Sequence, residues 1–176
     1  MADFSQFDKQ VNIDQLQKDI QAAHKNAPTG DSGDTPAGEY MARFENIELG
    51  ATKDGRPMFK VMMRLNTLDM YEPEDKDILT EETEKYLKRF KPGKGGCIFM
   101  NRVIFGTKND GNMIESVLGW IRKLEPSKQP VFTGYSDFAN YVMDLAEELV
   151  GTVDVHVTYD EDKFNSISIE EVIDLD

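Results

Sequence analysis

Residues 40–65 read YMARFENIELGATKDGRPMFKVMMRL, and this stretch decides the fold because it predicts a bulged β-hairpin. Its first half alternates apolar and polar residues, and the alternation slips by one residue in the middle, as it does at a β-bulge. The turn is Thr52-Lys53-Asp54-Gly55, in which Asp-Gly is a strong hairpin signal. The positions predicted to face inward are Tyr40, Ala42, Phe44, Ile47 and Leu49.

The returning strand of this hairpin has an unusual second face. One face is apolar and is expected to be buried: Phe59, Val61, Met63 and Leu65. The other alternates methionines with cations: Met58, Lys60, Met62 and Arg64. A solvent-facing side of a sheet is normally polar throughout, so this face is a candidate binding surface. Its methionines fit a homodimer surface equally well.

Three more strands and three helices are predicted downstream. A short helix begins at Thr80, after an acidic loop over 69–77, and longer helices cover 112–124 and about 136–149. The remaining strands cover 97–105, 152–159 and 164–173, the last with a second phase slip near Glu170 and Glu171.

This element order predicts a mostly β fold with helical insertions. Five strands in the order β-β-β-α-α-β-β indicate a five-stranded, OB-like antiparallel barrel. The alternative is another small antiparallel α+β barrel or sandwich. We expect an appended N-terminal helix within 1–25, a flexible Gly- and Pro-containing linker over 26–37, and the OB-fold domain over 38–176.

Charge is distributed unevenly along the chain. The 176 residues carry a net charge of −13, yet the window 85–108 holds seven bases and no acid, which leaves −20 on the other 152 residues. The bases are Lys85, Lys88, Arg89, Lys91, Lys94, Arg102 and Lys108. Cations concentrated among aromatic rings indicate a patch that binds a polyanion. The alternative is a basic helix and turn that only balance their acidic surroundings.

Several functional classes are disfavoured by the sequence. No apolar run approaches the ~20 residues of a membrane span, and the first residues do not resemble a signal peptide. A single cysteine, Cys97, fits the reducing cytoplasm. Two histidines, His24 and His156, are too few for a zinc site and do not indicate a nucleophilic triad. We therefore expect no enzyme activity, no metal and no cofactor.

The positive residues fit the way an OB barrel holds single-stranded nucleic acid. Such a barrel binds across its second and third strands, with cations on phosphates and rings on bases. We expect Lys91, Lys94 and Arg102 to matter most, facing the cations of the returning strand. The candidate nucleic-acid-binding residues are Arg43, Lys53, Arg56, Lys60, Met62, Arg64, Tyr86, Lys88, Arg89, Phe90, Lys91, Lys94, Phe99 and Arg102.

Short motifs within residues 36–124 also carry a family resemblance. They are the strand entry Pro36-Ala37-Gly38-Glu39-Tyr40, the turn Thr52-Lys53-Asp54-Gly55-Arg56-Pro57-Met58, Phe99 followed by Asn101, and the helical pair Leu118-Gly119. Together they resemble phage-encoded, OB-fold single-stranded DNA-binding proteins. The resemblance implies sequence-independent binding of single-stranded DNA during phage or prophage DNA replication or recombination. It also implies replication or recombination proteins as partners, in the cytoplasm of a bacterial host.

Two other functions remain open from the sequence. A phage protein–protein adaptor or structural component would use the acidic faces and the methionine-bearing strand, without binding nucleic acid. A nuclease or other metal enzyme would use the acid-rich turns, such as Asp160-Glu161-Asp162. Charge reversal at Lys60, Arg64, Lys88 and Arg89 separates the first hypothesis from both of these, because only DNA binding should collapse while the fold survives.

Overall fold

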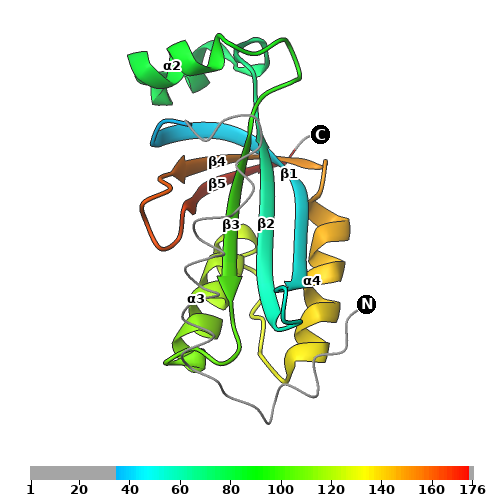
Figure 1. Ribbon diagram of the computed structural model, residues 1–176. Coiled ribbons are helices and arrows are strands. Elements are labelled where there is room, and N and C mark those ends of the chain that lie inside the picture. The colour runs from blue at the N-terminus through cyan, green and yellow to red at the C-terminus, as the bar shows by residue number, and fades with distance from the viewer. Residues whose placement is uncertain (1–34, 175–176) are drawn as a thin grey trace. The chain divides into compact units, whose positions relative to one another are not determined.

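The computed structural model describes residues 35–174, so the predicted helix within 1–25 and most of the predicted linker lie outside the described residues. The strands are β1 (Gly38–Ala51), β2 (Pro57–Leu65), β3 (Cys97–Val103), β4 (Val153–Tyr159) and β5 (Ile167–Asp174) (Figure 1). The α-helices are α2 (Glu81–Leu87), α3 (Asp110–Leu124) and α4 (Tyr135–Leu149). These elements confirm the predicted strands and helices, with shifted ends.

The strands form one five-stranded sheet in the order β3-β2-β1-β4-β5. The predicted five strands with helical insertions are confirmed, and because β3 and β5 are the two edges, the sheet is open and is not a closed barrel. Ser166, just before β5, donates its hydroxyl to the Phe99 carbonyl of β3 at 2.9 Å, which is a side-chain contact and not a backbone ladder. Hydrophobic periodicity predicts which residues form strands, but it carries no information on whether the edge strands pair.

The described residues divide into two compact units. Unit 1 comprises 46–61 and 101–148, and unit 2 comprises 35–45, 62–100 and 149–174. Strands β1, β2 and β3 each contribute residues to both units.

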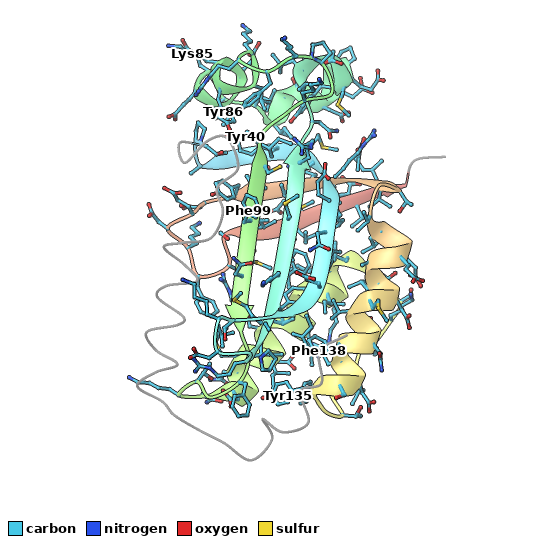
Figure 2. All side chains as sticks on the ribbon, turned by 45° about the vertical axis from the view of Figure 1, so that its right-hand side comes forward. Tyr40, Lys85, Tyr86, Phe99, Tyr135 and Phe138 are labelled. Carbon is cyan, nitrogen blue, oxygen red and sulfur yellow. The ribbon has the colours of Figure 1, made fainter. Side chains whose placement is uncertain are left out.

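Unit 1 is built around an aromatic core beneath β2. Phe59 is fully buried, and its ring lies 5.7 Å from that of Trp120 on α3 and 6.5 Å from that of Phe138 on α4. Tyr135, which comes from the same end of α4 as Phe138 (Figure 2), donates its hydroxyl to the Ile104 carbonyl at 2.8 Å. Phe59 therefore fixes both long helices to the sheet residues of unit 1.

Unit 2 is built on the antiparallel ladders that β4 makes with β1 and β5. Tyr40 lies opposite Val157 and Ala42 opposite Val155, and all four side chains are buried. The β4–β5 register shifts between His156 and Val157, so that β5 contains one extra residue. This shift confirms the phase slip predicted near Glu170.

The predicted bulge in β1 is also confirmed. The Asn66 N–H donates to the Met41 carbonyl, and the Thr52 N–H donates to the Arg56 carbonyl. Between these two hydrogen bonds, β1 advances by one residue more than β2. Glu45 is one of two consecutive exposed residues at this point, where strict alternation would bury one of them. The bulge restores the apolar face of β1 in time for Ile47 and Leu49.

The predicted acidic loop over 69–77 is in part helical. Two 3-10 helices, η2 (Leu68–Met70) and η3 (Pro73–Ile78), occupy most of it. The predicted cap at Thr80 is confirmed, because its hydroxyl accepts the Thr83 N–H at 3.2 Å and the Thr83 hydroxyl accepts the Thr80 N–H at 2.9 Å. None of the helices within residues 35–174 has the length and apolar character needed to cross a membrane.

Candidate nucleic-acid interface

Seven residues between α2 and β3, 88–94, form a strongly positive segment that we call the basic loop. It contains no acid, and its four cations are exposed: Lys88, Arg89, Lys91 and Lys94. Lys88 makes a long ion pair with Glu84, at 3.5 Å, one helical turn earlier. Within residues 35–174, Lys91 and Lys94 have no ion-pair partner. The loop therefore presents positive charge that the described chain does not neutralise.

The conformation of the basic loop is fixed by contacts with the end of β2. Gly93 has a φ of 74°, and its N–H donates to the Thr67 hydroxyl at 2.9 Å. A Cβ at Gly95 would lie 2.0 Å from the Leu65 carbonyl oxygen, so only glycine allows this close approach. Leu65 in turn donates its N–H to the Gly96 carbonyl at 2.8 Å. The cations of the loop are thus held on an ordered backbone.

Tyr86, predicted as a stacking ring, is buried beneath the basic loop. Its hydroxyl lies 2.9 Å from that of Thr35, and its ring meets the Phe90 ring edge-on at 5.1 Å. The Arg89 guanidinium lies 5.4 Å from the centre of the same ring. In Figure 2, Tyr86 extends from α2 toward the strands, whereas Lys85 extends away from them. Tyr86 supports Arg89 and Phe90 and has no face available for a base.

Two hydrogen bonds give the register between β2 and β3. Leu65 donates its N–H to the Gly96 carbonyl in unit 2, and Ile104 donates its N–H to the Pro57 carbonyl in unit 1. The two residue numbers have the same sum in both bonds, so both bonds have the same strand offset. This offset places Met62 opposite Phe99 on the face of unit 2 that is not packed against the core. Both side chains are half-buried, whereas their neighbours Met63 and Met100 are buried. Met62 and Phe99 therefore form an accessible apolar row.

The arginines of this outer face are paired with acids of neighbouring strands. Arg64 donates to Glu45 at 2.6 Å and to the Gly95 carbonyl at 2.7 Å, so it connects the outer face to the end of the basic loop. Arg43 pairs with Asp154 of β4 at 2.5 Å. The two predicted cations are half-exposed, with 39% of the Arg43 side chain and 38% of the Arg64 side chain accessible, but their charge is largely compensated.

His156 belongs to the same pattern of cross-strand pairs. Its Nε2 lies 2.9 Å from an oxygen of Glu39 on β1, and its side chain is half-buried. The structure shows a second polar contact between β4 and β1, which has a structural role.

Four predicted residues lie in unit 1, and two of them are buried. Lys53 is exposed in the hairpin turn and Lys60 is half-buried on β2. Arg56 is 7% exposed and bonds Asp54 at 2.9 Å, and burial lowers the pKa of its guanidinium. Arg102 is 6% exposed and donates to the Asn101 carbonyl at 2.7 Å.

The burial of Arg102 corrects the expectation that it faces the cations of the returning strand. Side chains alternate along a strand, and Arg102 has the same parity as Met100 and Ile104, which are 1% and 0% exposed. Burial lowers the pKa of the Arg102 guanidinium to about 10, because desolvation disfavours its charge. Phe99 has the opposite parity, so Phe99 and Arg102 do not share a face.

The structure also identifies residues that the sequence reasoning missed. Thr67 and Gly95 hold the basic loop, and Glu45 and Asp154 neutralise the arginines of the outer face. The Gly95-Gly96 pair was a visible signal of close backbone approach. No local signal in the sequence indicates the acids, because they become neighbours of the arginines only through strand pairing.

The motifs behind the family resemblance lie at strand entries and turns. Pro36 accepts a hydrogen bond from the Tyr40 hydroxyl at 2.6 Å, and Thr52 accepts from the Arg56 N–H at 3.1 Å, so both motifs have a structural role here. They explain how the chain folds locally and do not identify a ligand. Comparison with protein-family models, with curated proteins and with solved structures finds no match to this chain.

Proposed function

We propose that this protein binds single-stranded DNA without catalysis and largely independently of sequence. The binding surface is the basic loop together with the accessible apolar row of Met62 and Phe99 in unit 2. The observation that carries the proposal is the exposed, ordered and acid-free loop 88–94 in a chain of net charge −13.

The chemistry of this surface favours a single strand over a duplex. Lys91 and Lys94 would contact phosphates, whereas Phe99 and Phe90 offer half-buried rings to bases. Bases expose their faces only when they are unpaired and unstacked, and stacking on an aromatic ring contributes ~1–3 kcal/mol per base. Every base has such a face, which makes this mode of binding tolerant of sequence.

We extend the proposal to the fold and the setting. An OB-type barrel can be partly open, and an open five-stranded sheet with one hydrogen bond from the Ser166 hydroxyl, just before β5, to the Phe99 carbonyl of β3 is compatible with that description. The buried cysteine, Cys97, is compatible with the reducing cytoplasm of a bacterium. Phage or prophage DNA replication or recombination is the proposed setting, as the family resemblance implies.

The direct test is a fluorescence-anisotropy titration of labelled oligo-dT at several salt concentrations. Oligo-rU and a duplex of matched length serve as competitors. We expect micromolar or tighter binding at low salt that weakens steeply as salt rises, because each contacted phosphate of a single strand adds about −0.7 to the slope of log K against log salt. Absence of micromolar binding at low salt would contradict the proposal and favour the adaptor alternative.

A charge-reversal pair locates the interface. The double variant K91E/K94E is expected to lose at least tenfold in oligo-dT affinity, because two phosphate contacts become repulsive. The matched control is K123E/K163E, which makes the same charge change at two exposed lysines outside the proposed surface. Equal losses in the two variants would show that net charge, and not the basic loop, governs binding.

A further inference from the structure

The hydroxyl of Thr67 connects the basic loop to the acidic segment that follows β2. It accepts the Gly93 N–H at 2.9 Å and donates its own proton to Oδ1 of Asp69 at 2.6 Å. Thr67 is 1% exposed, whereas Asp69 is exposed. A hydroxyl has a single proton, so the carboxylate that accepts this proton leaves a lone pair of the Thr67 oxygen for the loop. Asp69 is therefore two hydrogen bonds away from the backbone of the basic loop.

The position of Asp69 is itself fixed by the fold of unit 2. Asp69 lies in η2, where the Met70 N–H donates to the Thr67 carbonyl at 2.9 Å. Tyr71, which follows η2, is buried, and its hydroxyl accepts the Met41 N–H of β1 at 2.9 Å. The carboxylate is thus held on a short turn that is anchored at both ends, and it can order the basic loop through Thr67.

We propose that Asp69 is a positioning residue of the DNA-binding surface, because its carboxylate acts through Thr67 to hold the basic loop in the conformation that binds phosphate. This inference rests on the proposed function of the same loop. By charge alone, an acid beside a cationic loop weakens the binding of a polyanion. A loop that is ordered only part of the time binds with an affinity reduced by that fraction, and we expect this effect to be the larger one. Asp69 thus strengthens the binding of DNA although its charge opposes it.

The sign of one substitution separates the two effects. Asp69→Ala removes both the charge and the hydrogen bond, and we expect oligo-dT affinity to fall about fivefold, as for a loop that is competent about a fifth of the time. Asp69→Asn removes the charge but keeps an oxygen that accepts the Thr67 proton, so it should recover most of this loss. The matched control is Asp77→Ala, which removes another exposed acid of the same segment and should not weaken binding. Tighter binding by Asp69→Ala, or equal affinities of the two alanine variants, would overturn the inference.

The salt dependence of Asp69→Ala gives an independent readout. The slope of log K against log salt reflects the number of contacted phosphates, and this variant leaves Lys91 and Lys94 in place. We therefore expect its loss of affinity to persist at every salt concentration, with an unchanged slope. An effect of the Asp69 charge alone would be screened as salt rises. A loss that vanishes at high salt would therefore overturn the inference.

A double-mutant cycle tests whether Asp69 acts through Thr67. Thr67→Val keeps the shape of the buried side chain but removes its hydroxyl. Because both substitutions break the same connection, the double variant should lose no more oligo-dT affinity than the weaker-binding single variant. Fully additive losses would show that Asp69 acts by another route, and would overturn the inference.

A further measurement needs no DNA. NMR relaxation of the full chain gives the order parameter of the Gly93 N–H bond, which is about 0.85 for rigid backbone and below about 0.6 for flexible backbone. We expect a rigid Gly93 in the wild-type chain and in Asp77→Ala, and a flexible one in Asp69→Ala, with β4 unchanged to show that the fold survives. A Gly93 that is flexible in the wild type, or equally rigid in Asp69→Ala, would overturn the inference. If no variant binds oligo-dT, the proposed function fails, and the order parameter still decides whether Asp69 positions the loop.

Discussion

The basic loop and the outer face of the sheet in unit 2 both carry predicted cations, but these cations differ in how they are paired with acids. In the loop, Lys91 and Lys94 are exposed and have no ion pair within residues 35–174. On the outer face, Arg43 and Arg64 each meet an acid from a neighbouring strand, at 2.5 and 2.6 Å. Nearby residues in the sequence set the charge of the loop, whereas strand pairing sets the charge of the face.

This difference separates two roles for positive charge. Exposed pairs contribute little to stability, typically ~0–1 kcal/mol each, so the arginine pairs mainly fix side-chain positions on the sheet. A cation that has no ion pair in the protein can bind a phosphate without first breaking a contact with a carboxylate. We therefore expect the loop to supply most of the phosphate affinity and the outer face to supply the surface on which bases rest.

The largest effect is expected when the anchor of the loop is broken by Gly95→Ala. The new Cβ would lie 2.0 Å from the Leu65 carbonyl oxygen, so backbone must shift, and we expect a loss of about 2–3 kcal/mol in the free energy of unfolding. The matched variant is Gly93→Ala. Its φ of 74° disfavours alanine by about 1 kcal/mol, but its Cβ would meet nothing within 4 Å. The measurement is chemical denaturation of both variants. Equal midpoints would contradict the close approach of Gly95 to the Leu65 carbonyl.

The next effect concerns the apolar row of the outer face. Phe99→Ala removes a half-buried ring opposite Met62, and we expect oligo-dT affinity to fall by ~1–3 kcal/mol, the usual contribution of one stacked base. Phe164→Ala is the control, because that side chain is 52% exposed and lies outside the proposed surface. Anisotropy titrations should show a loss for the first variant alone. A loss of affinity confined to Phe164→Ala would move the base-binding surface to the β4–β5 turn.

A smaller effect compares one cation from each region directly. Lys91→Gln should weaken oligo-dT binding several-fold and reduce the magnitude of the salt slope by about 0.7, as expected for one lost phosphate contact. Arg64→Gln should leave the slope nearly unchanged, because Arg64 is engaged by Glu45 and by the Gly95 carbonyl. The measurement is affinity at four or more salt concentrations. A larger change of slope in Arg64→Gln would reverse the roles assigned to the two regions.

Much of the fold was predictable from the sequence, because its signals are local. Alternation in residues 40–65 indicated both strands and the bulge that precedes Ile47. Thr80 marked the start of α2, and the slip near Glu170 marked the irregular pairing of β5. Closure of the barrel was not predictable in this way, because it depends on whether β3 and β5, far apart in the sequence, form a backbone ladder.

The candidate site was only partly predictable, for the same physical reason. The loop cations lie in a contiguous segment, so their common exposure follows from local composition. Arg102 was misassigned because residues 97–105 are apolar at both odd and even positions, so alternation alone does not show which face is buried, and the structure buries Arg102 on the same face as Met100. The partners of Arg43 and Arg64 come from other strands, and single-sequence reasoning cannot supply that register.

The smallest effect would test whether the outer face takes part in binding at all. Glu45→Gln removes the acid that holds Arg64 and lies next to the apolar row, so we expect about a twofold gain in oligo-dT affinity as Arg64 becomes available to phosphate. Glu48→Gln makes the same charge change at another exposed residue of β1 and serves as the control. Loss of one surface pair should lower the free energy of unfolding by less than about 1 kcal/mol, so altered folding would not account for a gain. Equal gains in the two variants would show a general charge effect, and would leave the basic loop as the sole source of phosphate affinity in unit 2.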